Sequence, residues 1–568
     1  MAKFLIGVLT GVLFVCLLAV LLMFAAARYW SSPPPSVAQG STLVLDLEGE
    51  IPERPPVEYP VPLPGAGHRV TVENVWSGLK KAAADRRITA VVLAPESLDA
   101  GWGKLQEIRD GLKQFRKSGK PLYAYLRAPG AREYYLATAA DRIYLAPEDF
   151  LNLKGMRVEL VYFKSTLDKL GVQVEVEHAG KYKDFGDMFT RTSMSPETRE
   201  VLTSVLDELY SGLVGAVAEG RRKGPEEVRE LIDQGPFLAS RVVAAGLIDA
   251  VSFEDEMYTA LKQKLQQREV KKISIHDYSR VPAASLGLEG RPRIALVVAE
   301  GGITRGDSGG AMPDGIESGE FTELLRRVKD DSGIRGVVVR IDSPGGEVAA
   351  SDEIWRKMNL LSRKKPLVIS MSDSAASGGY YISMTGDPIV AYPGTFTGSI
   401  GVVFGKPNLR GLYDKLGITK DSLTRGRFAD IDSDYKPLGE EGRRKLQQAL
   451  EESYRGFVSK VAQSRRRKVE EIEPLAQGRV WLGSQARQRG LVDELGGLDR
   501  ALELVKQKAK IPVSEKVAVQ TYPPRRTILD LLTGRGRSGL LGWLESWEAR
   551  LALKGGPLRL MPYSITVQ

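Results

Sequence analysis

The sequence contains almost no cysteine and little histidine. Its one cysteine, Cys16, lies inside an N-terminal apolar run, which excludes an internal disulfide framework, a zinc–thiolate site and a cysteine protease mechanism. The three histidines, His68, His178 and His276, are interpreted as surface or packing residues. A Ser-His-Asp triad is therefore not expected. We also expect neither a metal ion nor a cofactor.

A strong excess of charge of one sign is also absent. The 568 residues carry a formal net charge of +9, with 43% apolar and 27% charged residues, which is typical of a globular protein with several domains. The sequence has no zinc-finger spacing, no RNP-type aromatic motif and no basic arm, so nucleic-acid binding is not expected. Attraction to anionic lipid is compatible with the charge, with solvated Lys and Arg as the alternative.

Long apolar runs are rare, and one dominates the N-terminus. Residues 4–27 read FLIGVLTGVLFVCLLAVLLMFAAA and contain no charge over 24 positions, enough for a helix to span the ~30 Å hydrocarbon core of a bilayer. We interpret this segment as a retained transmembrane anchor, because it is longer than the apolar core of a usual signal peptide. The alternative is a cleaved signal peptide ending at the small residues 25–27. Residues 28–40 form a linker that includes the stiff sequence SSPPPS, and one soluble body is expected on this tether.

After the linker, the chain repeats itself. The matching segments are EGEI at 48–51 and EGGI at 300–303, YY at 134–135 and 380–381, DKLG at 168–171 and 414–417, and GLID at 246–249 and GLVD at 490–493. An offset that stays near 246 residues over so long a stretch indicates an internal duplication. We predict two copies of one domain at 41–285 and 286–515, followed by a tail at 516–568.

Within each copy, short β-branched runs alternate with helical stretches. The second copy reads IALVVA, FTELLRRVKDD, GVVVRID, ASDEIWRKMNLLSRK and PLVISMS in order. This alternation predicts an α/β fold with parallel strands covered by helices. In the tail, residues 540–551 place leucines and tryptophans on one helical face, which we assign to core packing or subunit contact, with membrane-surface binding as the alternative.

The two copies differ where chemistry is expected. Ser377, in SDSAASGGYY, corresponds to Ala131 in the first copy, whereas Lys183, in GKYKDF, corresponds to Ala429 in the second. Each copy thus lacks the residue that the other retains, which predicts one composite site built from both copies. The alternative is that two unrelated positions have changed by neutral drift. A serine hydroxyl needs a base to become a good nucleophile, and a lysine can be that base once its amine is neutral. Asp184 follows the lysine, and we expect its side chain to point away, because a nearby carboxylate would keep the amine charged.

Backbone donors for a tetrahedral oxyanion are also present. Gly378 follows the serine directly, and Gly346 ends the motif DSPGG; both are candidates for an oxyanion hole. Ser399, in TFTGSIG, is a candidate for orienting the lysine amine, with an ordinary turn-forming serine as an equal alternative.

Together these motifs resemble the signal peptide peptidase A family in its long, double-repeat form. The resemblance implies two tandem crotonase/Clp-protease-like repeats of ββα units behind one N-terminal transmembrane helix. It also implies a self-compartmentalising homotetramer in the cytoplasmic membrane, with the soluble body on the extracytoplasmic side. By motif match, Ser377 is the nucleophile and Lys183 the general base, Gly346 and Gly378 form the oxyanion hole, and Ser399 orients the lysine.

The sequence therefore predicts a membrane-anchored serine endopeptidase. Its expected partners are extended apolar peptides such as cleaved signal peptides, membrane lipid around the anchor and further copies of the chain. Two alternatives stay open: an acyl-CoA hydratase or isomerase of the crotonase fold, and a non-catalytic membrane scaffold of protease origin.

Overall fold

The computed structural model describes residues 35–55, 69–306, 315–524 and 558–561, together with ten residues between positions 7 and 21. Those ten residues are helical and exposed. The rest of the predicted anchor at 4–27, and the helix predicted at 540–551, lie outside the described residues. The anchor and the amphipathic helix therefore stay predictions.

The first repeat is built on a parallel six-stranded sheet in the order β8-β4-β3-β2-β1-β9. Its strands are β1 (Ser41–Glu50), β2 (Ile88–Asp99), β3 (Leu122–Leu126), β4 (Arg142–Leu145), β8 (Ala250–Val251) and β9 (Lys271–Ser274). The central strands are buried on both faces, as their continuous aliphatic sequences predict for a parallel sheet. The helices of this unit are α2 (Val72–Ala84), α3 (Trp102–Arg116), α4 (Ala131–Ala137), α8 (Pro225–Gln234), α9 (Ala239–Ala244), α10 (Glu254–Leu265) and α11 (Ile275–Ser279).

The second repeat has the same order of parallel strands, β20-β16-β15-β13-β10-β21, and adds β17 and β19 beside β15. Its strands are β10 (Arg293–Glu300), β13 (Ile334–Ser343), β15 (Leu367–Ala376), β16 (Ile389–Ala391), β17 (Phe396–Gly398), β19 (Val480–Leu482), β20 (Glu494–Leu495) and β21 (Ala518–Tyr522). Its helices are α12 (Ser318–Asp330), α13 (Val348–Ser362), α14 (Gly378–Ile382), α17 (Val469–Ile472), α18 (Gly483–Gln488) and α19 (Leu498–Lys508). Edge strand β21 uses residues that the sequence assigned to the tail, so the predicted boundary at 515 falls before the last strand of this sheet.

The motifs that the two copies share serve the fold. Tyr134 donates a hydrogen bond from its hydroxyl to the carbonyl of Leu247 at 2.6 Å, and Tyr380 makes the matching bond to Leu491 at 2.8 Å. The YY and GL(I/V)D motifs thus tie a helix to a distant turn in the same way in each copy. Short 3-10 helices at Ala283–Leu286 and Glu473–Leu475 complete the local structure of the two units.

A third sheet joins the two repeats. Its order is β12-β11-β14-β22-β18-β6, formed by β6 (Gln173–Ala179) from the first copy, β11 (Ile303–Thr304), β12 (Ile316–Glu317), β14 (Gly345–Glu347) and β18 (Val402–Asn408) from the second, and β22 (Leu558–Leu560) from the tail. Around it lie α5 (Lys164–Leu170), α6 (Asp187–Thr190), α15 (Arg410–Leu416) and α16 (Glu440–Arg465). A small antiparallel pair, β5 (Phe150–Leu151) and β7 (Phe237–Leu238), lies in the first repeat.

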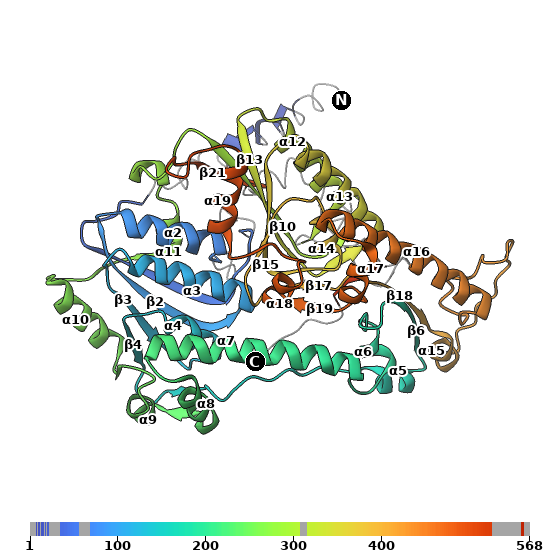
Figure 1. Ribbon diagram of the computed structural model, residues 1–568, viewed down its shortest axis with the longest axis horizontal. Helices are drawn as coiled ribbons and strands as arrows, with labels where there is room; N and C mark the ends of the chain where they lie inside the picture. Colours follow the sequence, from blue (N-terminus) through green and yellow to red (C-terminus); the bar gives the residue numbers. More distant parts are fainter. Residues whose placement is uncertain are drawn as a thin grey trace.

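Helix α7 (Pro196–Arg221) runs from beneath the first sheet toward α5 and α6 (Figure 1). Among the described residues it is the one helix whose length and composition would suit a membrane span. Val201, Val205, Leu209 and Leu213 follow the spacing of one helical face, and all four are buried in the hydrophobic core. This packing accounts for the apolar character of α7.

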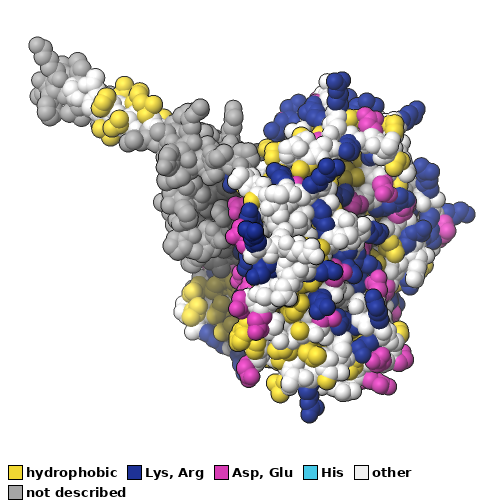
Figure 2. Space-filling view, turned by 90° about the vertical axis from the view of Figure 1, so that its left-hand side faces the viewer, with side chains coloured by type: hydrophobic (Ala, Val, Ile, Leu, Met, Phe, Trp, Pro, Cys, Tyr) yellow, Lys and Arg dark blue, Asp and Glu magenta, His cyan; other side chains and the backbone are white. Residues whose placement is uncertain are grey.

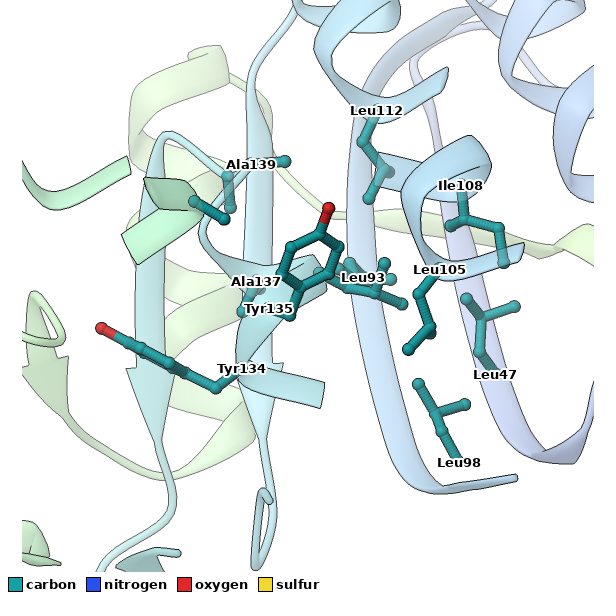
Figure 3. Close-up of a cluster of buried hydrophobic side chains, with 14 of the residues drawn as sticks. Leu47, Leu93, Leu98, Leu105, Ile108, Leu112, Tyr134, Tyr135, Ala137 and Ala139 are labelled. Atoms are coloured by element: carbon teal, nitrogen blue, oxygen red, sulfur yellow. The ribbon is translucent and has the colours of Figure 1, made fainter. Parts of the chain in front are cut away.

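The core of the first repeat lies between the sheet and helices α3 and α4. Figure 3 shows Leu47 and Leu93 from the strands facing Leu105 and Ile108 from α3, with Tyr135 of α4 alongside. Burying side chains of this size is worth about 1.5–3 kcal/mol each. On the outside, Lys and Arg are interspersed with Asp and Glu over the face that Figure 2 shows.

Candidate active site

Strand pairing between the two repeats brings the predicted site together. β6 and β18 pair antiparallel over seven positions, from Ala179 opposite Val402 to Gln173 opposite Asn408. Lys183 lies four residues after the end of β6, and Ser399 lies three residues before the start of β18. The pairing therefore fixes these two residues at one end of the same ladder, although 216 positions separate them in the sequence.

Ser377 lies at a sharp junction between β15 and α14. Its backbone has φ 54° and ψ −111°, a region that residues other than glycine rarely adopt and that is often found at functional sites. Its N–H donates to the carbonyl of Gly398 at 2.8 Å, so the end of β17 holds the junction. The hydroxyl is thereby presented in a fixed direction rather than on a free loop.

The amine of Lys183 lies within hydrogen-bonding distance of three oxygen atoms. Its Nζ is 2.8 Å from Ser377 Oγ, 2.9 Å from Ser399 Oγ and 3.1 Å from the Ser399 carbonyl oxygen. All three side chains have a relative exposure of 0%. The structure therefore brings the predicted nucleophile, base and orienting residue into direct contact.

The loop that carries Lys183 packs against a turn of the second repeat. Tyr182 donates its N–H to the Gln477 carbonyl at 2.8 Å. Gly478 has φ +77°, and a Cβ there would lie 2.6 Å from the backbone nitrogen of Lys183. This turn was not predicted from the sequence. The dipeptide Gln-Gly, which occurs at both 234–235 and 477–478, is the signal in the duplication that would have found it.

The acidic residues next to the lysine have other partners. The Asp184 carboxylate accepts a hydrogen bond from the hydroxyl of Thr198, and burial raises the pKa of Asp184 to about 6. Asp187 lies 3.6 Å from the guanidinium of Arg191. Both carboxylates thus contact residues other than the lysine and the two serines, while the charge of Lys183 lowers the pKa of Asp184 by less than burial raises it.

Gly346 and Gly378 come from different elements and meet beside Ser377. A Cβ added to Gly378, the first residue of α14, would lie 3.0 Å from the backbone nitrogen of Gly346 and 2.8 Å from Ser351 Oγ. A Cβ on Gly346 would lie 1.9 Å from the carbonyl oxygen of Ile303. Neither position has room for a side chain, and the two glycine backbones pack closely against each other beside Ser377.

The corresponding place in the first repeat is closed. Ala131 stands where the second copy has Ser377, and the nearby Glu133 carboxylate accepts hydrogen bonds from the N–H groups of Leu98 at 2.7 Å and Gly130 at 2.9 Å. In the first copy a carboxylate thus already accepts from two backbone N–H groups of this region, whereas the position that corresponds to Glu133 in the second copy is Gly379. No equivalent nucleophile and donor pair exists there.

A buried charged cluster lies behind the DSPGG loop and was missed by sequence reasoning. The Arg340 guanidinium lies 2.8 Å from Glu53 and 2.5 Å from Glu107, and the Lys104 amine lies 2.7 Å from Asp342. Each pair joins one repeat to the other. Arg340 interrupts the otherwise apolar strand GVVVRI, which is the sequence signal for such a cluster.

The arrangement supplies the parts needed for acyl transfer. It contains a buried hydroxyl, an amine in contact with it and two adjacent backbones able to donate to an oxyanion. In the described part of the chain, no group of three or more His, Cys, Asp or Glu side chains is arranged to hold a metal ion.

Comparison with known proteins agrees with this chemistry. The model of peptidase family S49 matches residues 114–268 and 359–512. Serine protease SPPA, chloroplastic, of Arabidopsis thaliana is 37% identical over 88% of this chain and 74% of its own length. Protease 4 of Salmonella typhi is 32% identical over 86% of this chain and 81% of its own length. Among solved structures, ClpP1 from Listeria monocytogenes overlaps 36% of this chain and 91% of its own, with 14% identity and a TM-score of 0.22; the α/β assignment rests on the sheets themselves.

Proposed function

Because this chain belongs to peptidase family S49 and is a serine peptidase, we propose that it cleaves peptide bonds with Ser377 as nucleophile and Lys183 as general base. The observation that supports this most directly is the 2.8 Å contact between Lys183 Nζ and Ser377 Oγ in a fully buried site. No histidine takes part in this pair.

The first step is attack by the serine. A neutral amine has two N–H groups and one lone pair, which suits donation to the two oxygens of Ser399 and acceptance of the Ser377 proton. Burial disfavours the charged form of an amine and so favours this state. As Ser377 Oγ bonds to the scissile carbonyl carbon, its proton moves to Lys183.

The later steps use the same groups. The oxyanion accepts hydrogen bonds from the N–H groups of Gly346 and Gly378, and the C–N bond breaks as Lys183 returns its proton to the departing amine. This leaves an acyl-enzyme on Ser377. Water then attacks the ester, with Lys183 again taking and returning the proton, and releases the acid product.

The substrates and setting that we propose follow the sequence. We propose that the enzyme is anchored by residues 4–27, has its body on the extracytoplasmic side of the cytoplasmic membrane and degrades cleaved signal peptides and other extended apolar peptides. Each repeat is proposed to be a crotonase/Clp-protease-like unit of ββα elements, and the assembly a homotetramer. The apolar run and the family resemblance support these points. Because the chain is a serine peptidase, we propose neither of the two alternatives that the sequence left open, an acyl-CoA hydratase or isomerase and a non-catalytic membrane scaffold.

Covalent labelling tests the nucleophile. The full chain in detergent is treated with a fluorophosphonate probe, and the modified residue is identified by mass spectrometry. We expect labelling at Ser377 in the natural chain, and labelling slowed at least about 100-fold in Lys183→Ala, because the hydroxyl loses its base. Ser383, a buried serine whose hydroxyl donates to the Gly379 carbonyl at 2.9 Å, is the internal control. Equal labelling of Ser377 and Ser383 would contradict the proposal.

A further inference from the structure

The N-terminus of α3, in the first repeat, contacts β15 shortly before the candidate nucleophile. Its N-cap residue, Gly101, has no side chain to cap the helix, and the Asp373 carboxylate of β15 accepts hydrogen bonds from the N–H groups of Gly101 and Lys104, each at 2.7 Å. The carboxylate thus lies at the positive end of the helix dipole. A Cβ at Gly101 would lie 2.4 Å from Asp373 Cγ, so the contact is close. Because Asp373 lies four residues before Ser377, it ties α3 to the strand that presents the nucleophile.

Strand β15 bulges at this contact. In β13 one residue, Asp342, lies between the paired positions 341 and 343, whereas the matching interval of β15 contains three residues, 372–374. The Asp342 carboxylate accepts a hydrogen bond from the Ser374 N–H at 2.9 Å. Bulges are frequent next to active sites, where they re-aim a side chain. Here the bulge is held by side chains, because the ladder is interrupted.

The Lys104 amine lies between the two carboxylates that hold the bulge. Its Nζ is 2.7 Å from Asp342 and 3.8 Å from Asp373, and the side chain is only 7% exposed. Burial alone would lower the pKa of Lys104, but the nearby carboxylates, above all Asp342, outweigh burial and raise the pKa. The amine is therefore charged at neutral pH, in contrast to the neutral amine that the proposed mechanism requires of Lys183.

The first copy lacks both halves of this contact. KPL occurs at 120–122 and 365–367, an offset of 245, whereas YY at 134–135 and 380–381 gives 246. The second copy thus has one extra residue between these motifs, in the stretch that contains the bulge. Lys104 in turn corresponds to Ala350 in the second copy. The lysine and the bulge therefore belong to the one junction that carries the candidate site.

We propose that Lys104 is a positioning residue for peptide hydrolysis. Its amine holds the bulge that precedes Ser377 and, through Asp342, the start of the DSPGG loop that carries Gly346. The first repeat thereby sets the position of the nucleophile relative to the oxyanion donor. Without the cation, Asp342 and Asp373 repel each other, and the bulge and the loop move apart. The inference rests on the proposed function, since it takes Ser377 as nucleophile and Gly346 as donor.

Turnover of a fluorogenic peptide by full chains tests the role of Lys104. We expect Lys104→Met to lower kcat about 100-fold with KM within about two-fold, because a misplacement of about 1 Å costs that much. Fluorophosphonate labelling of Ser377 should slow by a similar factor, and Lys104→Arg, which keeps the charge, should recover at least about ten-fold. The matched control is Lys80→Met, at an exposed lysine of the first repeat that pairs with Asp499 of the second. Its kcat should stay within about two-fold.

A second variant covers the case in which Lys104→Met does not fold, as judged by urea unfolding. Lys104→Met combined with Asp373→Asn removes one unpaired carboxylate, and the bulge still lacks its cation, so kcat should remain at least about ten-fold below the natural chain. Near-normal kcat in a folded Lys104→Met or in this double variant would overturn the inference, as would an equal loss in Lys80→Met. In each case, hydrolysis that still requires Ser377 and Lys183 would leave the proposed function standing. Activity retained in Ser377→Ala would instead overturn the proposed function, and the inference with it.

Discussion

Ser399 contacts the lysine amine through two atoms, its hydroxyl at 2.9 Å and its carbonyl oxygen at 3.1 Å. Ser399→Ala removes the hydroxyl and keeps the carbonyl, so the amine stays buried but loses part of its orientation. We predict a fall in kcat of about ten-fold with KM little changed, because only proton transfer is affected. The matched control is Ser383→Ala, which removes the buried hydroxyl of the residue that follows α14 and donates to the Gly379 carbonyl. Full kcat in Ser399→Ala would mean that this serine only shapes the turn.

Asp184 makes stability depend on pH. Burial raises its pKa from 3.8 to about 6 in the folded protein, and its Oδ1 is buried without a hydrogen-bond partner among the described residues. The folded state therefore holds this proton more tightly than the unfolded state, and the resulting stabilisation is full below about pH 4 and is lost as the pH rises through 6.

The corresponding prediction compares Asp184→Asn with the natural chain. Between pH 4 and pH 7.5 the free energy of unfolding of the natural chain should fall by up to about 3 kcal/mol relative to the variant. Urea unfolding at a series of pH values measures this difference. Asp168→Asn, at a half-exposed carboxylate paired with Lys164, should run parallel to the natural chain. Parallel curves for Asp184→Asn as well would show that its carboxyl titrates normally.

Between elements, the position of the lysine depends on how its loop packs on the turn at 477–478. Gly478→Ala places a Cβ 2.6 Å from the backbone nitrogen of Lys183 at a residue with φ +77°. A shift of the loop by about 1 Å is enough to cost about 100-fold in rate, so we predict a loss of kcat of that size. The control Gly490→Ala has nearly the same φ, +73°, and its nearest neighbour is the side chain of Arg467 at 3.7 Å.

Both glycine variants should lose about 1 kcal/mol of stability through backbone strain. Only Gly478→Ala should lose activity, and peptide hydrolysis beside urea unfolding separates the two effects. If both variants kept full activity, the loop would tolerate the added methyl group, and its packing would not fix the position of the lysine.

The sequence could single out Ser377 and Lys183 as candidates, but not the strand pairing that brings them into contact. Comparison of the two copies singled out both residues, because each has an alanine at its counterpart. The β6–β18 ladder that joins them, and strand β22, could not be predicted, because long-range strand pairing is not encoded in local periodicity. The parallel sheets were predictable, since β-branched runs alternating with helices leave few other folds.

For the chain as a whole, the two repeats are held together by buried charges as well as by apolar packing. Arg340 lies between Glu53 of the first-repeat region and Glu107 of α3. Burial raises the pKa of Glu107, whereas for Glu53 the attraction of Arg340 and Lys104 outweighs burial and lowers the pKa. The Arg340 guanidinium is therefore the cation that stabilises the charged forms of both buried carboxylates.

Arg340→Met should leave these carboxylates buried without their cation. We predict a loss of about 3–5 kcal/mol at neutral pH, which becomes smaller in acid as the carboxylates take up protons. Arg455→Met, which removes an exposed pair with Glu451 at 3.1 Å, should cost less than about 0.5 kcal/mol. Equal urea midpoints for the two variants would mean that the buried charges contribute little to the stability of the association between the repeats.

Comparison of the two copies separates residues that maintain the fold from residues of the candidate site. Motifs kept in both copies, such as the tyrosines that reach Leu247 and Leu491, hold each unit together. Positions that differ include the candidate site residues, and in the first copy the Glu133 carboxylate accepts a hydrogen bond from the N–H of Leu98. Prediction of the charged cluster from sequence failed because a single arginine in a strand does not reveal its partners, which lie in the other repeat.

The pairing of Lys183 with Ser377 is tested most directly by the pH dependence of kcat/KM for a leucine-rich peptide. For the natural chain we predict a rate that rises through an apparent pKa below the ~10.4 of a free lysine side chain. Ser377→Ala and Lys183→Ala should each fall at least about a thousand-fold. If Ser377→Ala is inactive while Lys183→Ala keeps near-normal turnover with an unchanged pH profile, the serine uses another base, and the account of a composite Ser–Lys site is wrong.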